Sequence, residues 1–338
     1  MVSFQDLTEI EIRPDDLTTR FRAETERSVR ELLPPTALGD TPCPGCSGVR
    51  GTEAFEKIGF RYRECGECGT LFVSPRPDQV ALDRYYRESS AAAFWRARVL
   101  PATDPTRAEK VHRPRAQWIL DNIAEHRPEA TVGLDLTPYG VPLAETLLAL
   151  SLEGSHPVRR MIVANAASDL DPAPMSGDVV VKPRPLAEIP GLGPVDFVSA
   201  FDALERVASP AQLIEAARAT LHPGGLFFLS APSISGFDLQ VLWDRSRTIS
   251  PPEKINLLSI DALQGLFPSA HWTVHELSTP GMFDADAVRR ALLAEPGEPW
   301  PRVVRQLVRD HQAAEALQEF LQRQRLSSFA RILAERKD

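Results

Sequence analysis

Apolar residues between positions 195 and 232 follow strand spacing, then helix spacing, then strand spacing again. Residues 195–200 form a short apolar run with β-branched side chains, which predicts a buried strand. Ser209 and Pro210 can begin a helix, and one face of it would carry Leu213, Ile214, Ala217 and Leu221. Pro-Gly-Gly at 223–225 should stop that helix, and residues 226–229 predict a second buried strand. Continuous apolar strands joined by a helix indicate a parallel sheet covered on both faces.

The same patterns predict further elements on both sides of this unit. Residues 7–12 predict a short strand, and residues 284–337 predict a mostly helical region that packs either on its own sheet or on a second subunit. Helices are also expected at 21–33 and 107–127, and strands at 131–136, 159–165, 178–186 and 271–275.

Composition limits the class of protein. The chain has 338 residues, of which 43% are hydrophobic, so it can fill a sizeable core. Its formal net charge of -8 argues against broad affinity for nucleic acid or acidic membranes. No apolar run approaches a membrane span, and the first residues do not resemble a signal peptide. We therefore expect a cytoplasmic protein without a nucleic-acid or membrane partner.

The four cysteines form two tight pairs. Cys43 and Cys46 are separated by two residues, as are Cys65 and Cys68. In each pair a tight turn can aim both thiolates at one ion, and four such ligands are typical of a structural, tetrahedral Zn²⁺ site. A closed shell of four thiolates should stabilise the fold and should not activate water.

Two ordered sets of residues carry a family resemblance. The first set lies in the strand–helix–strand unit: Asp196, Phe197, Ala200, Phe201, Asp202, Leu204, Glu205, Leu221, Pro223, Gly224, Gly225 and Pro232. The second set follows the cysteines: Gly69, Phe72, Pro75, Arg76, Pro77, Tyr85 and Tyr86. Together they resemble class I S-adenosylmethionine-dependent methyltransferases of the subgroup with an N-terminal zinc ribbon, many of which act on sugars and other small metabolites.

This resemblance implies an α/β fold, with a doubly wound Rossmann-like methyltransferase domain, an N-terminal zinc ribbon and helical flanks. The expected organisation is an N-terminal arm at 1–40, the zinc ribbon at 41–77, a helical linker at 78–128, the Rossmann-like domain at 129–280 and a C-terminal helical region at 281–338.

The expected cofactor loop departs from the family pattern. In the family an acidic residue precedes a G-x-G-x-G turn, whose glycines let the backbone approach the cofactor. Asp135 holds the acidic position here, but Thr137, Tyr139 and Val141 stand at the glycine positions. Gly140 is out of register, and residues 131–150 contain no other glycine except Gly133.

Other positions of the family site have also changed. Asn165 stands where the second strand should end in an acidic residue for the ribose hydroxyls, while Phe201 keeps its family-equivalent position on the fourth strand. Lys182, Pro183 and Arg184 follow the third strand, where the family has an aspartate near the adenine amine. Family histidines are replaced by Arg206, Lys254 and Phe329.

Three functions are compatible with this pattern. The favoured interpretation is a methyltransferase homologue with a degraded S-adenosylmethionine site, acting as a non-catalytic partner in a homodimer or in a heterodimer with an active methyltransferase. The first alternative is an active small-molecule methyltransferase with an atypical cofactor loop, in which Glu205 and Lys254 are the catalytic candidates. The second is a repurposed pocket in which Lys182, Arg184, Arg206 and Lys254 hold an anionic metabolite.

Overall fold

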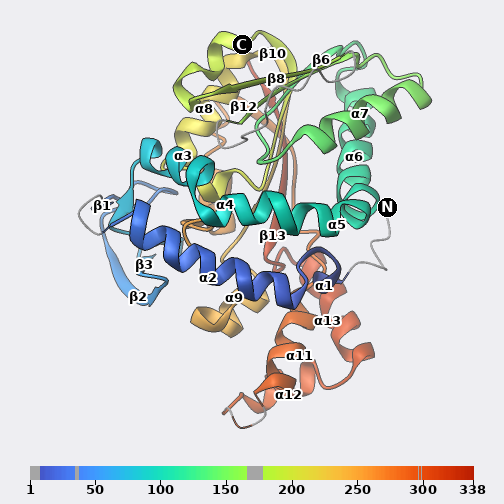
Figure 1. Ribbon diagram of the computed structural model, residues 1–338. Helices are drawn as coiled ribbons and strands as arrows, with labels where there is room; N and C mark the ends of the chain where they lie inside the picture. The colour runs from blue at the N-terminus through green and yellow to red at the C-terminus, as the bar shows by residue number, and fades with distance from the viewer. Residues whose placement is uncertain (1–7, 35–37, 166–177, 296, 298) are drawn as a thin grey trace.

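A seven-stranded sheet forms the centre of the molecule (Figure 1). The structure is a computed structural model that describes residues 8–34, 38–165, 178–295, 297 and 299–338. The strand order is β12-β13-β10-β9-β6-β7-β8, and β13 runs antiparallel to both of its neighbours. The strands are β6 (Val132–Asp135), β7 (Arg160–Asn165), β8 (Val179–Arg184), β9 (Val195–Phe201), β10 (Leu221–Pro232), β12 (Trp272–Ser278) and β13 (Phe329–Arg336). This is the doubly wound α/β fold expected from the sequence.

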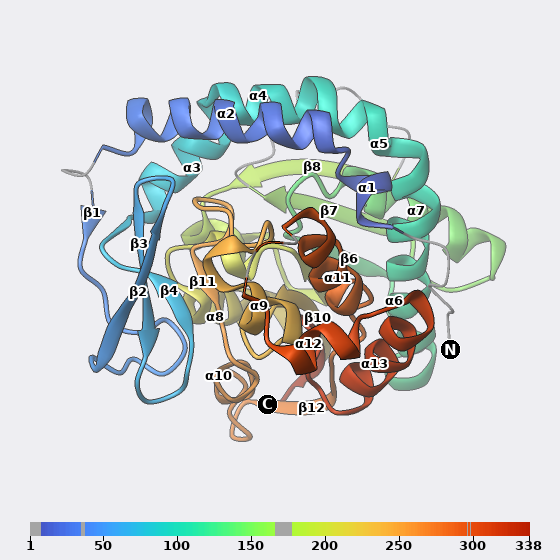
Figure 2. The same cartoon turned by 90° about the horizontal axis from the view of Figure 1, so that it is seen from below.

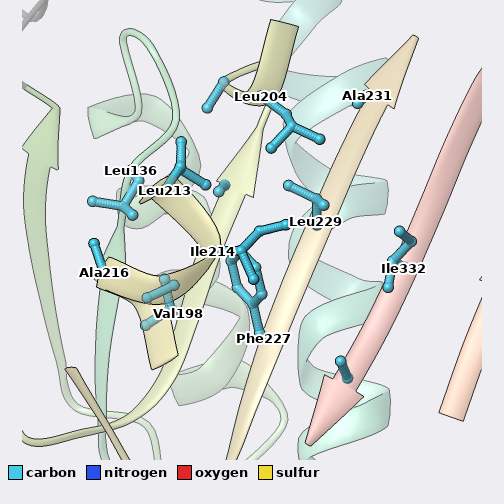
Figure 3. Packing of buried hydrophobic residues seen from close by; sticks show 14 of the residues in the cluster. Leu136, Val198, Leu204, Leu213, Ile214, Ala216, Phe227, Leu229, Ala231 and Ile332 are labelled. Carbon is cyan, nitrogen blue, oxygen red and sulfur yellow. The ribbon is translucent and has the colours of Figure 1, made fainter. Parts of the chain in front are cut away.

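Helices cover both faces of this sheet. One face packs on α6 (Arg113–His126) and α7 (Val141–Glu153), and the other packs on α8 (Pro210–Thr220) and α10 (Ile260–Gly265). Figure 3 shows the second face, where Leu213 and Ile214 of α8 lie over Val198 of β9 and Phe227 of β10. Because β9 and β10 are buried on both sides, their sequences are mostly apolar.

The Pro-Gly-Gly sequence does not end α8, contrary to the prediction. The helix ends at Thr220, and Leu221 already belongs to β10. Gly224 has a φ of 73°, a conformation that glycine adopts without a steric penalty, and the pairing of β10 with β9 shifts register between Leu221 and Leu226. The glycines therefore form a bulge near the start of the strand.

The cysteine segment forms a separate four-stranded sheet. Its order is β11-β4-β3-β2, with β2 (Gly51–Lys57), β3 (Phe60–Cys65), β4 (Leu71–Val73) and β11 (Asn256–Leu257). A two-residue pairing of β1 (Leu38–Gly39) with β5 (Arg76–Pro77) lies beside it. Since β11 comes from the range predicted for the Rossmann-like domain, strand pairing joins that range directly to the ribbon.

The N-terminal arm and linker form a helical layer. It contains α1 (Glu9–Ile12), α2 (Asp15–Leu32), α3 (Gln79–Glu88), α4 (Ser90–Phe94) and α5 (Leu100–Arg107), and Figure 2 shows α2 and α4 side by side along one edge of the molecule. The predicted strand at 7–12 is wrong for its described residues. The Glu11 side chain accepts a hydrogen bond from the Thr8 N–H, which completes a capping box and favours a helix.

The C-terminal region is helical only in part. The helices α11 (Asp284–Ala294), α12 (Arg302–Leu307) and α13 (His311–Arg323) pack with α9 (Phe237–Leu242) around a small apolar cluster, not on the central sheet. The prediction of a helical region to residue 338 is wrong for β13. Ala330, Ile332, Leu333 and Ala334 are buried between β10 and β12, so tertiary pairing sets the conformation of this segment.

No helix in the described part of the chain is both long enough and apolar enough to cross a membrane.

Candidate functional site

The order of the parallel strands reverses at β6, which has β7 on one side and β9 on the other. In open α/β sheets, ligands bind outside the carboxyl ends of the strands at such a switch point. The loop that follows Asp135 meets the end of β9 at Phe201 there. The chemistry of this edge therefore depends on how that loop packs on the end of the strand.

Asp135 is fully buried at the end of β6 and is bonded within the loop. Its Oδ1 accepts hydrogen bonds from Thr137 Oγ1 at 2.6 Å, Ser199 Oγ at 2.6 Å and the Thr137 N–H at 3.3 Å. Thr137 Oγ1 also accepts a hydrogen bond from the Phe201 N–H at 3.0 Å. The loop and the end of β9 are thus tied to each other through Thr137, at a position where the family has glycine.

Tyr139 and Gly140 complete the loop in an unusual way. Tyr139 has a φ of 59°, in the left-handed region that glycine adopts more easily than any other residue. A Cβ on Gly140 would lie 1.8 Å from Asp135 Oδ2, so only glycine fits there. The backbone retains a conformation suited to glycine at 139, while the sequence supplies a tyrosine.

Asn165 turns back toward the first strand. Its Nδ2 donates a hydrogen bond to the Leu136 carbonyl at 2.7 Å. Lys182 and Arg184 lie at the exposed end of β8, where Arg184 Nε is 3.8 Å from Glu188 Oε2. The structure therefore brings Asn165 and Arg184 to the same edge as Asp135.

A first cavity of about 50 Å³ lies at this edge. Leu136, Pro138, Asn165 and Arg184 line it from the sheet side. Gln79, Asp83 and Tyr86 of α3 line it from the helical layer. Small-molecule sites usually enclose roughly 300–1,000 Å³, so this cavity is several times smaller than a typical ligand site.

Glu205 and Lys254 are brought together as a buried ion pair between Lys254 Nζ and Glu205 Oε1. Their side chains are 0% and 10% exposed, respectively. Burial lowers the pKa of Lys254, although the charges of Glu205 and Asp202 oppose this effect. Tyr62 of the ribbon donates a hydrogen bond to the Lys254 carbonyl at 2.6 Å. The pair therefore lies where the ribbon meets the Rossmann-like domain.

A second cavity of about 90 Å³ lies beside this ion pair. Lys254, Tyr139 and Arg206 line it together with residues that the sequence did not single out for a site, namely Arg13, Thr18, Phe21, Trp95, Arg247 and Glu253. Tyr86 and Arg206 line both cavities. Phe329 begins β13 opposite Pro232 and is not among the residues that line either cavity.

One segment around this edge matches a known protein family. Residues 114–277, from α6 to β12, match the model of a family described as a methyltransferase domain. This segment is similar to methyltransferase domains. The matched segment contains six of the seven central strands and excludes both β13 and the cysteine ribbon.

Comparison of the chain with solved structures gives partial superpositions. A putative sarcosine dimethylglycine methyltransferase from Galdieria sulphuraria is 16% identical, with a TM-score of 0.42 over 71% of this chain and 88% of that chain. The plantazolicin methyltransferase BpumL in complex with SAH is 9% identical, with a TM-score of 0.44 over 76% and 94%. An S-adenosylmethionine-dependent methyltransferase from Mesorhizobium loti is 14% identical, with a TM-score of 0.39 over 65% and 98%. No curated protein matches the sequence.

The four cysteines converge outside the segment that matches this family. One Sγ atom from each of Cys43, Cys46, Cys65 and Cys68 lies within 4.8 Å of all the others. The Sγ atoms of Cys43 and Cys68, and those of Cys46 and Cys65, are 3.6 Å apart. Zn–S bonds of about 2.3 Å in a tetrahedron place sulfur atoms roughly 3.8 Å apart. The four thiols therefore fit a tetrahedral metal ion.

Backbone groups support the two cysteine turns. The N–H groups of Gly45, Gly48 and Glu67 each donate to a cysteine Sγ at 3.4 Å. Such bonds orient the ligands and stabilise the thiolate form that a metal requires. The cluster thus has both the geometry and the surrounding donors of a structural metal site.

Asp135 gives a pH-dependent prediction. Burial raises its pKa to about 6, although hydrogen bonds from Ser199 and Thr137 oppose this effect. Because the folded protein binds this proton more tightly than the unfolded chain, the stability that it contributes is complete below about pH 4 and is lost as the pH rises through 6, at a cost of about 3 kcal/mol. The free energy of unfolding of Asp135→Asn minus that of wild type should therefore be higher at pH 8 than at pH 5.

Urea denaturation of both proteins at pH 5 and pH 8 measures this difference. Asp196→Asn is the matched control, because Arg127 and two backbone N–H groups outweigh burial and lower the pKa of Asp196. Its stability difference from wild type should be the same at both pH values. If the stability difference between Asp135→Asn and wild type were also the same at both pH values, the pKa of Asp135 would not be raised.

Proposed function

We propose that this chain is a methyltransferase homologue with a degraded S-adenosylmethionine site, which serves as a non-catalytic partner subunit. The observation that carries the proposal is the closed loop after β6. There Thr137 joins Asp135 to the backbone of Phe201, and the Gly140 Cα approaches the Asp135 carboxylate too closely for any side chain. The groups that should receive the cofactor are bonded to one another.

The neighbouring groups support the same conclusion. Asn165 offers an amide donor to the Leu136 carbonyl, whereas a ribose diol is better held by a carboxylate that accepts two hydrogen bonds. The cavities on the two sides of Tyr86 and Arg206 measure about 50 and 90 Å³. Neither has the volume of a typical small-molecule site. These residues do not fit S-adenosylmethionine, so we assign no methyl-transfer step to the chain.

The rest of the molecule favours a structural role in an assembly. We propose that the four cysteines hold one structural Zn²⁺, that the protein is cytoplasmic, and that it pairs with a second copy or with an active methyltransferase. In this proposal selection maintains the fold and not the transfer reaction.

The decisive experiment is calorimetric titration of the full-length protein with S-adenosylmethionine and S-adenosylhomocysteine. We expect no heat of binding up to about 1 mM ligand, because the loop can open only if Thr137 gives up its two hydrogen bonds to Asp135 and the one it accepts from the Phe201 N–H. Circular dichroism and metal content should be checked on the same sample, so that misfolding does not imitate the negative result. Micromolar binding of either compound would overturn the proposal and favour an active methyltransferase with an atypical loop.

A further inference from the structure

Lys57 joins the cysteine ribbon to the segment that is similar to methyltransferase domains. It is the last residue of β2, and its Nζ donates hydrogen bonds to the carbonyls of Asp244 and Ser246, each at 2.7 Å. These two residues follow Lys57 by 187 and 189 positions in the chain. The Lys57 side chain is half-buried, so it is partly withdrawn from water but can still be reached from the surface.

The other lysines have different surroundings. The chain contains only five lysines, at positions 57, 110, 182, 254 and 337. Lys110 and Lys254 each pair with a glutamate, while Lys182 and Lys337 are exposed to water. Among the residues that the structure describes, Lys57 is therefore the half-buried lysine that has no carboxylate partner.

The two carbonyls match the donors of a neutral amine. A protonated lysine has three N–H donors, whereas a neutral amine has two donors and one lone pair. Two carbonyl acceptors satisfy both donors of the neutral form and leave its lone pair free. Burial and the nearby charge of Arg22 lower the pKa of Lys57 to about 8, although the Asp244 carboxylate opposes this effect. Such surroundings favour the nucleophilic form of a lysine.

The carbonyls that Lys57 binds lie in a strained turn. Trp243 has a φ of 51°, in the left-handed region that is rare for a bulky residue. Its ring packs edge-on against Phe55 of β2, with the ring centres 5.6 Å apart. The two carbonyls follow Trp243 directly, so one strand of the ribbon holds the turn through both an aromatic contact and the amine. A chemical change at Lys57 should therefore also affect the turn.

We propose that Lys57 is an acylation site, at which the amine accepts a small acyl group from an acyl phosphate or a thioester. Nζ attacks the acyl carbon and forms a C–N bond, the bond from that carbon to the phosphate oxygen or the thiolate sulfur breaks, and one amine proton is released. The resulting amide keeps a single N–H, so one of the two carbonyls loses its donor and the turn loosens. The inference does not depend on whether S-adenosylmethionine binds.

The test is acetylation of the full-length protein with acetyl phosphate and, separately, with acetyl-coenzyme A, followed by mass spectrometry of each lysine peptide. At pH 7.5 about a quarter of an amine with a pKa of about 8 is neutral, compared with roughly 0.1% of an ordinary lysine. Partial burial and lower basicity reduce this advantage, so we expect Lys57 to react about tenfold faster than Lys182 and Lys337. The donor that acetylates Lys57 faster identifies the source of the acyl group.

Arg22→Ala tests the electrostatic contribution without disturbing the core. Removal of this neighbouring cation makes the protonated amine easier to form, so acetylation of Lys57 at pH 7.5 should slow about twofold. Arg27→Ala is the matched control, because both arginines lie on α2 and pair with a glutamate of that helix, with side chains 61% and 58% exposed. The control should leave the rate unchanged.

Hydrogen exchange measured by mass spectrometry reports on the turn. After acetylation the amides of residues 243–248 should exchange several-fold faster, while those of β9 remain unchanged. Lys57→Arg keeps the donors but cannot be acetylated, so acetyl phosphate should leave exchange in this variant unchanged. The proposal is overturned if Lys57 is acetylated no faster than Lys182 and Lys337, or if its acetylation leaves exchange at 243–248 as it was.

Discussion

Replacing Cys65 by serine should leave the protein unfolded or aggregated at room temperature. Structural zinc contributes roughly 10–16 kcal/mol to the folding of small zinc domains, whereas whole proteins are stable by only about 5–15 kcal/mol. The turn from Cys65 to Cys68 joins β3 to β4, and β4 pairs with β11, which lies in the segment that matches the methyltransferase family. Loss of the metal should therefore destabilise the central body as well as the ribbon.

Metal analysis by mass spectrometry should find about one zinc per chain in wild type and little zinc in the variant. Thermal denaturation with and without a chelator measures the effect on stability. Val49→Ser is a suitable control, because this side chain lies in the same segment and is 80% exposed. Zinc-free wild type that melts at the temperature of the loaded protein would rule out a structural metal.

Much of the fold could be predicted because its strands are buried on both faces. The apolar runs that became β6, β7, β9 and β10 have no polar face to obscure their pattern. The errors arose where local and tertiary signals compete. Residues 8–12 alternate like a strand, but the capping box of Thr8 and Glu11 favours a helix. Residues 329–336 follow a helical region in the sequence, but pairing with β10 makes them the strand β13.

The functional site could be predicted only in part. The family resemblance pointed to Asp135, Asn165 and Phe201, and the structure places all three at one edge because the carboxyl ends of parallel strands meet there. The sequence could not show that α3 lines the first cavity, since Gln79 and Asp83 lie 53 and 49 residues before Val132, where β6 begins. Glu253 is next to the candidate Lys254 in the sequence. Its burial could not be predicted, because it depends on Tyr85 and the helical layer, which pack against it only in the folded chain.

The ribbon and the site are joined by specific polar contacts. Arg76 donates to Asn256 Oδ1 at 2.9 Å and to the Ala208 carbonyl at 2.8 Å, while Tyr62 holds the Lys254 carbonyl. Tyr86 donates to the Pro252 carbonyl at 2.8 Å. These contacts fix the backbone from 252 to 256. Tyr62, Arg76 and Tyr86 therefore hold residues 252–256 in the position that places Lys254 against Glu205.

Replacing Lys254 by methionine should cost about 3–5 kcal/mol in the free energy of unfolding, because it leaves a buried carboxylate without its counter-ion. Glu205 is poorly placed to tolerate this loss, since its Oε2 already has no hydrogen-bond partner. The double variant Glu205→Leu/Lys254→Met removes both charges, and it should recover most of the lost stability. Urea denaturation of the wild type, both single variants and the double variant gives the coupling free energy.

An exposed pair provides the comparison for this cycle. Arg323 and Glu319 also form a salt bridge, but their side chains are 75% and 66% exposed. Arg323→Met should therefore change stability by less than about 1 kcal/mol. If the double variant at 205 and 254 were as unstable as the sum of its single variants, the two charges would not be coupled. The buried ion pair could then not be what holds the segment before β11 against the end of β9.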